Sequence, residues 1–353
     1  MASGTTPTRP IDHNTFGPAI VLLGVGMLLT GLGTAFLGPV LPLLASQWHI
    51  TDQQSGLLIT AKFVGAFLGG MSVHRLVRFG VLGGYLLAGI GFAVFAMGHG
   101  MAFGIVGLFV SGYGVGLGIT ATNILIGRRY TTHTGAALST LNFFWSLGAV
   151  LCGFLAALLL PRFGLHGPML SFGGLFLLTA LAGILFSTHR EGPKLPVGVV
   201  IPAAAPSLPL PRLIYLHFCS MLFLYGGLET CISAWLTTYS LRIGGIHLLE
   251  GQSAVVLFWT ALTAGRVLGS GAMRAFSETA VQRVGLTLSA LLILGVATTS
   301  NNIMLSVYCV LLGLGLAPFF PPPSPSLSAA APTRTRQAPC SPSRVSALRS
   351  SRG

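Results

Sequence analysis

Residues 79–127 read FGVLGGYLLAGIGFAVFAMGHGMAFGIVGLFVSGYGVGLGITATNILIG, which is 49 consecutive residues without an Asp, Glu, Lys or Arg. A hydrocarbon layer about 30 Å thick is crossed by roughly 20 helical residues, so this stretch has room for two membrane-crossing helices. The sequence Gly98-His99-Gly100 supplies a turn between them. This stretch therefore predicts the fold class, an all-α, polytopic transmembrane helical bundle.

The composition of the whole chain supports that class. Charged residues make up 7% of the 353 residues and the mean hydropathy is +0.81, whereas soluble domains carry about 25% charged residues. Six carboxylates cannot cover a surface that faces water. Most of the 19 Lys and Arg residues lie in short loops and in the C-terminal tail, which indicates a membrane protein and not a nucleic-acid-binding one.

The other charge-free runs give the remaining spans. Six spans are expected before a proline-rich segment and four after it, which we write as an N-terminal six-helix bundle (1–187), a cytoplasmic linker (188–211), a C-terminal four-helix bundle (212–320) and a disordered Pro/Ser/Arg-rich tail (321–353). The predicted spans are 16–44, kinked near Pro39 and Pro42, then 54–74, two within 79–127, 130–161, 163–189, 213–239, 253–273, and two within 284–333 that turn at 300–302.

The basic residues also predict the orientation. With the N-terminus in the cytoplasm, nine Lys and Arg residues fall in cytoplasmic loops, and only Arg162 and Arg242 fall in outer loops. Cytoplasmic loops of membrane proteins carry this excess of positive charge. We expect a multi-pass protein of the bacterial inner membrane with a cytoplasmic N-terminus.

Two short motifs recur half a chain apart. Gln54-Ser55 recurs as Gln252-Ser253, and the sequence GLG at 116–118 recurs at 313–315, so the offsets are 198 and 197 residues. Parallel repeats of this kind are typical of transporters whose solute site lies at the midplane between two halves. The same offset predicts a fifth helix of the second half after residue 332, where the chain instead becomes rich in Pro, Ser and Arg. A frameshift or a truncated gene model would produce such a change, and the helices that correspond to spans 11 and 12 are therefore expected to be missing.

Four segments carry a resemblance to a known family. Residues 70–78 (GMSVHRLVR) resemble the G-x-x-x-D-R-x-G-R loop signature of the major facilitator superfamily, with Gly70, Arg75 and Arg78 retained and a histidine at the acidic position. Residues 141–149 (LNFFWSLGA), together with 225–229 (YGGLE) and 235–239 (WLTTY), resemble the fucose-permease-like branch of sugar–proton symporters. The resemblance implies a two-bundle transporter fold and a conformational role for the loop. The fucose symporter uses carboxylates in its first and fourth helices, and this chain has none in either.

Three ionisable residues fall within predicted spans, and a charge at the bilayer centre costs at least ~2.5–3.5 kcal/mol. Glu229 lies near the middle of the seventh span, and its apolar setting suits a group that binds and releases a proton. Lys62 and Arg266 are its candidate charge partners, and a fixed structural pair is the alternative to proton coupling. Lys62 could also reach a membrane interface, and Arg266 could bind solute or form an inner gate.

Neutral side chains complete the candidate solute site. Asn123 and Asn142 offer both donors and acceptors that match sugar hydroxyls, or else they join helices to one another. Trp145, Trp235 and Tyr225 could stack on a sugar ring, although Trp235 lies nearer a helix end, where tryptophan commonly anchors the interface.

The predicted function is secondary active transport of a small polar solute, with a sugar as the candidate class, coupled to protons and working by alternating access. A proton-antiporting exporter of drugs or metabolites and an inactive truncated remnant are the alternatives. No catalytic or metal-ligand pattern occurs in the sequence, so we expect no enzyme activity, no cofactor and no metal. The expected partners are solute, proton and lipid, and the expected state is a monomer.

Overall fold

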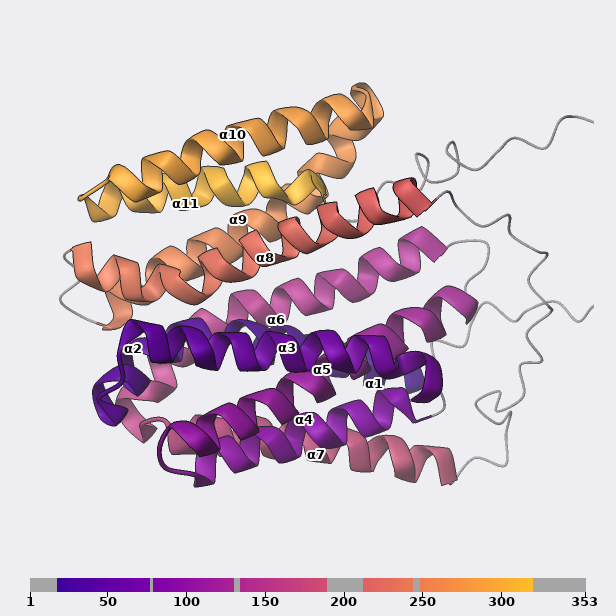
Figure 1. Ribbon diagram of the computed structural model, residues 1–353. Coiled ribbons are helices and arrows are strands. Elements are labelled where there is room, and N and C mark those ends of the chain that lie inside the picture. Colours follow the sequence, from indigo (N-terminus) through magenta and orange to yellow (C-terminus); the bar gives the residue numbers. More distant parts are fainter. Residues whose placement is uncertain (1–17, 77–78, 130–133, 189–211, 244–247, 320–353) are drawn as a thin grey trace, which may run out of the picture.

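The computed structural model describes residues 18–76, 79–129, 134–188, 212–243 and 248–319, and within these residues all regular structure is helical (Figure 1). The helices are α1 (Pro18–Ala35), α2 (Leu37–Trp48), α3 (Asp52–Leu76), α4 (Gly80–Met97), α5 (Met101–Arg129), α6 (Thr134–Phe163), α7 (His166–Thr188), α8 (Arg212–Ile243), α9 (Leu248–Ala275), α10 (Glu278–Thr298) and α11 (Asn302–Leu316), followed by a 3-10 turn (Ala317–Phe319).

The described helices match the predicted spans in number and order. Seven of them are long and apolar enough to cross a membrane, and the bent pair α1 and α2 makes an eighth if it is one span. Residues 252–268 of α9 and the whole of α11 are shorter apolar helices. Counted together, these elements give six before residue 189 and four after residue 211 in the described part of the chain, so the predicted all-α transmembrane bundle is confirmed. The absence of spans 11 and 12 stays a prediction.

The first span is broken at Phe36, where α1 and α2 meet at an angle of 42°. Pro39 explains the break, since proline has no N–H to donate and its ring collides with the carbonyl group four residues earlier, here that of Ala35. Pro42 lies inside α2 without ending it. The predicted kink near Pro39 is thus confirmed.

The two halves repeat the same packing. In the first half α5 packs against α3 and α4, and in the second half α11 packs against α9 and α10. Figure 1 shows α8 to α11 gathered on one side of the molecule and α1 to α7 on the other.

The recurring GLG motifs occupy equivalent places in these interfaces. A Cβ atom on Gly116 would collide with the carbonyl oxygen of Ala66 on α3, and one on Gly313 would collide with that of Phe258 on α9. Small residues allow helix backbones to approach this closely in membranes. The repeat that the sequence predicted is therefore a repeat of helix contacts.

The halves meet through α2 on α8 and through α6 on α9. At one end of the bundle, Arg242 Nη2 of α8 donates to Asp52 Oδ1 of α3 at 2.6 Å. Deeper in the same interface, the buried Gln252 amide of α9 donates to the carbonyl oxygen of Pro39 on α2 at 3.0 Å. These contacts join elements that lie about half a chain apart in sequence.

Several predictions fall on residues that the structure does not describe. Arg78, the linker beyond Thr188 and the tail over 321–353 lie outside the described residues. Their assignments stay as predictions.

Candidate functional site

A cavity of about 210 Å³ lies between the two halves. Its walls come from the break in the first span, from α3 and α6 of the first half, and from α8 and α9 of the second. The lining residues are Thr34, Ala35, Leu37, Gly38, Phe63, Trp145, Gly226, Glu229, Thr230, Ser233, Ala234 and Trp259.

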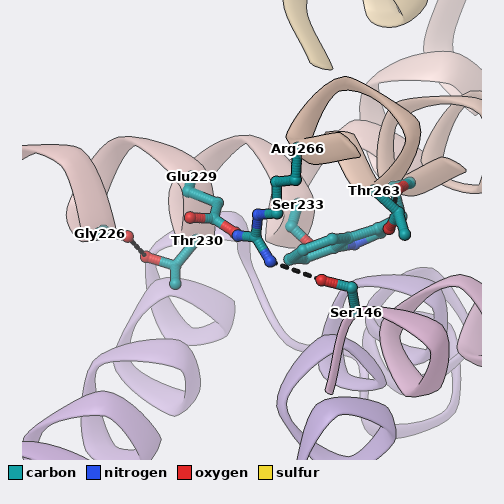
Figure 2. A network of polar contacts seen from close by, with 8 residues as sticks. Ser146, Gly226, Glu229, Thr230, Ser233, Thr263 and Arg266 are labelled. Atoms are coloured by element: carbon teal, nitrogen blue, oxygen red, sulfur yellow. Dashed lines mark hydrogen bonds and ion pairs between the residues drawn. The ribbon is translucent and has the colours of Figure 1, made fainter. Parts of the chain in front are cut away.

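A buried ion pair stands at the wall of this cavity. The Glu229 side chain on α8 keeps 8% of its surface exposed, and its Oε1 lies 3.5 Å from Nη2 of Arg266 on α9. Arg266 also donates from Nη1 to Ser146 Oγ on α6 at 2.5 Å. Figure 2 shows the guanidinium of Arg266 reaching between Glu229 and Ser146, so that one side chain connects the acid of the second half to a hydroxyl of the first. The predicted pairing of Glu229 with Arg266 is present in the structure.

Two tryptophans form the aromatic part of the wall. Trp145 and Trp259 meet edge to face with ring centroids 5.5 Å apart. The Arg266 guanidinium lies 5.9 Å from the Trp145 ring, within the range of a cation–π contact. The indole N–H of Trp259 donates to Ser233 Oγ at 3.0 Å, which satisfies the polar edge of this buried ring.

Lys62 neither lines the cavity nor takes part in the Glu229–Arg266 pair. Its ammonium group donates to the carbonyl oxygens of Gly33 at 2.6 Å and Thr34 at 2.9 Å. Neither of the two ion pairs found among the described residues includes Lys62. The structure therefore does not bring Lys62 together with Glu229, because the carbonyl groups at the end of α1 occupy it instead.

The other four predicted solute contacts do not line the cavity. Tyr225 is buried one helical turn before Glu229 on α8, and its role in solute binding stays a prediction. Asn123 and Asn142 are half-buried on α5 and α6 and do not line the cavity, while Trp235 lines a separate pocket of about 200 Å³ next to Asp52 and Arg242. A role for these three residues in solute binding stays a prediction.

The loop motif is only partly described. Gly70 lies near the end of α3 and faces α5, where the Thr120 hydroxyl approaches it, and Arg75 is exposed in the last turn. His74, which stands at the acidic position of the signature, bonds through Nδ1 to the carbonyl oxygen of Met71 at 2.7 Å. This local bond stays within α3, so it does not tie the loop to a neighbouring helix.

Sequence reasoning missed Trp259, Ser146, Thr34 and Ser233. Trp259 carried a usable signal, because a tryptophan in the middle of a span is away from the interface that it normally anchors. The hydroxyl residues carried none, since Ser and Thr in a membrane helix usually bond to their own backbone.

Comparison with known proteins identifies the family. The model of the Major Facilitator Superfamily matches residues 23–339, which is most of the chain. The chain belongs to this superfamily. It is accordingly a multi-pass integral membrane protein.

The chain is also similar to individual curated proteins, at 25% to 29% sequence identity. The chain is 29% identical over 169 residues to the 4-hydroxybenzoate transporter PcaK of Pseudomonas putida, an overlap that covers 46% of this chain and 38% of that protein. It is 25% identical over 160 residues to the niacin transporter NiaP of Acinetobacter baylyi, covering 44% and 36% of the two chains. Over 297 residues it is 25% identical to a TsgA homolog of Edwardsiella ictaluri, covering 83% and 73%. The matches to PcaK and NiaP thus span well under half the length of those transporters.

Solved structures share the fold. A bacterial homolog of the lysosomal transporter Spinster, in an inward-facing conformation, has a TM-score of 0.63 at 15% identity and covers 87% of this chain and 74% of its own. FucP in its outward conformation has a TM-score of 0.57 at 19% identity, covering 85% and 83%. The D-xylose–proton symporter has a TM-score of 0.56 at 13% identity, covering 85% and 80%. At these identities the likeness concerns the fold alone.

Proposed function

We propose that this chain carries a small organic solute across the membrane together with a proton, by alternating access of its two halves to the cavity between them. The observation that carries the proposal is the buried Glu229–Arg266 pair in the cavity wall. A charge buried in a membrane protein is costly, and it is retained chiefly where it pairs or works in a solute or ion pathway.

The pair suggests how proton and solute binding depend on each other. Arg266 stays charged, because a guanidinium does not lose its proton in proteins, whereas a carboxyl group can exchange one. When Glu229 takes up a proton, its attraction for Arg266 disappears and N–H groups of the guanidinium become available. A solute oxygen then takes the place of the Glu229 carboxylate, and release of the proton restores the pair.

We further propose an aromatic monocarboxylate as the solute class. A carboxylate accepts two parallel hydrogen bonds from a guanidinium, and a flat ring fits a wall built from Trp145, Trp259 and Phe63. The names of PcaK and NiaP, which transport 4-hydroxybenzoate and niacin, support this class.

A sugar, the class predicted from the sequence, is the second candidate. The hydroxyl groups of Thr34, Thr230 and Ser233 line the cavity and favour it. All three are already engaged, since Thr34 donates to the carbonyl oxygen of Thr30, Thr230 donates to that of Gly226, and Ser233 accepts from Trp259. A hexose needs many polar partners, so the available groups suit a carboxylate better.

The setting of this function is also part of the proposal. We propose a monomer in the bacterial inner membrane with its N-terminus in the cytoplasm, in which Gly70, Arg75 and Arg78 form the loop that controls the conformational change. Export of the solute by proton antiport and a transport-inactive remnant remain the alternatives.

The experiment is uptake into proteoliposomes with and without a pH gradient. The purified protein is given labelled 4-hydroxybenzoate, nicotinate, its uncharged amide nicotinamide, or a hexose. A gradient of one pH unit corresponds to about 1.4 kcal/mol per proton, so a one-to-one symporter accumulates its solute roughly tenfold. We expect accumulation of a carboxylate and none of nicotinamide.

Variants then test the role of Glu229. Glu229→Gln should abolish gradient-driven accumulation while solute exchange continues, and Glu278→Gln, at the first residue of α10, is the matched control. Accumulation of the hexose alone would select the sugar class, and movement of solute only against the proton flow would select the exporter. If a folded protein moves none of the four compounds under any gradient, the proposal fails.

A further inference from the structure

Lys62 is a charged residue in the interior that the proposed function does not use. It lies in the middle of α3 with 2% of its surface exposed. No carboxylate of the described residues lies within ion-pair distance of its ammonium group. Burying an unpaired charge costs several kcal/mol, so other groups must offset that cost.

The groups that do so are the carbonyl oxygens of Gly33 and Thr34, at 2.6 and 2.9 Å from Lys62 Nζ. Both belong to the last turn of α1, which ends at Ala35. The C-terminal end of a helix carries partial negative charge on carbonyl groups that the helix itself leaves unpaired. The buried ammonium group of Lys62 and the carbonyl groups at the end of α1 thus supply each other's hydrogen-bond partners inside the first half.

The place where they meet is the break in the first span. Before the break, α1 packs within its own half on α6 and α7, and after the break α2 packs on α8 of the other half. Thr34, Ala35, Leu37 and Gly38, the residues on either side of Phe36, all line the central cavity. A shift at the break would therefore move the cavity wall.

We infer that Lys62 is a positioning residue that holds the end of α1 against α3, and that it thereby fixes the cavity wall at the break. The ammonium group holds the carbonyl end in place while Pro39 keeps the two helices from joining. This inference rests on the proposed function only for its effect on solute, because the link between Lys62 and the break can be measured without transport.

The first test is a double-mutant cycle on thermal unfolding in detergent. Lys62→Met removes the donors and keeps a chain of similar length. Pro39→Ala removes the ring that collides with the Ala35 carbonyl group, so that α1 and α2 can join and the N–H groups of Leu37 and Gly38 can bond the carbonyl groups of Gly33 and Thr34 in place of Lys62. We expect Lys62→Met alone to lower the Tm by roughly 5 °C or more, and to lower it much less in the Pro39→Ala background. Val73→Ala, a buried change in α3 away from the break, is the control and should lower the Tm by the same amount in the wild-type and Pro39→Ala backgrounds.

Additive effects of Lys62→Met and Pro39→Ala would overturn the inference. If Lys62→Met alone fails to fold, folding of the double variant supports the inference, and failure of both variants contradicts it.

The second test separates positioning from general stability. With 4-hydroxybenzoate as the transported probe, Lys62→Met should raise KM about tenfold, equivalent to about 1.4 kcal/mol, with little change in kcat. Lys62→Arg, which can still donate to both carbonyl groups, should recover most of the wild-type KM. An unchanged KM in a Lys62→Met protein that does transport would refute the role at the cavity, and the unfolding cycle still decides the inference if the chain transports nothing.

Discussion

Removing one partner of the Glu229–Arg266 pair should cost more stability than removing both. At 3.5 Å and an effective dielectric constant of about 20, two unit charges attract by about 5 kcal/mol. Arg266 keeps its contacts with Ser146 and Trp145 when Glu229 is lost, so we expect Glu229→Gln to cost about 3 kcal/mol. Arg266→Met should cost less, because the isolated carboxyl group can take up a proton whereas the guanidinium cannot release one.

The double variant Glu229→Gln/Arg266→Met should recover most of this loss, since it leaves no charge in the cavity wall. Unfolding can be followed in detergent with a thiol-reactive dye in a background where the exposed Cys219 and Cys231 are replaced by serine, because Cys152 and Cys309 are buried free thiols. About 3 kcal/mol corresponds to a Tm change of roughly 10 °C in a protein of this size.

The Asp52–Arg242 pair is the internal comparison. Its atoms are closer, at 2.6 Å, but its side chains are 57% and 59% exposed, and exposed pairs contribute little. A double-mutant cycle on Asp52 and Arg242 should therefore show a much weaker coupling between the two residues than the cycle on Glu229 and Arg266. If the double variant at Glu229 and Arg266 loses the sum of the two single losses, the two charges do not interact and the reasoning is refuted.

Two further predictions follow from the contacts between helices. Gly116→Val should prevent α5 from packing on α3 and leave little folded protein in size-exclusion chromatography, whereas Gly226→Val, at a glycine with open space around it, should give a normal yield. Arg242→Gln removes the ion pair that joins the halves at one end, so a cysteine placed at Thr238 in the adjacent pocket, with Cys219 and Cys231 replaced by serine, should react faster with a maleimide. An unchanged rate would show that the pair does not restrain that end.

The sequence predicted part of the candidate site because charge is expensive in lipid. Glu229 and Arg266 stood out as ionisable residues within apolar runs, and the structure places them in contact. Asn123 and Asn142 were chosen by chemistry alone, and neither lines the cavity. A membrane helix is apolar on its lipid-facing and protein-facing sides alike, so the sequence gives little indication of which side faces the cavity.

The sequence by itself determined the order of the helices in the described part of the chain, the turn at 98–100, the break near Pro39 and the repeat of the GLG motif. These features are local, since hydropathy, a missing N–H and a missing Cβ act on their immediate surroundings. Only the tertiary structure decided that Lys62 bonds to the end of α1, that Trp259 faces Trp145 and that Asp52 reaches Arg242. Each of these contacts depends on how two helices far apart in the chain cross and rotate against each other, and close packing of side chains along their whole length sets that geometry.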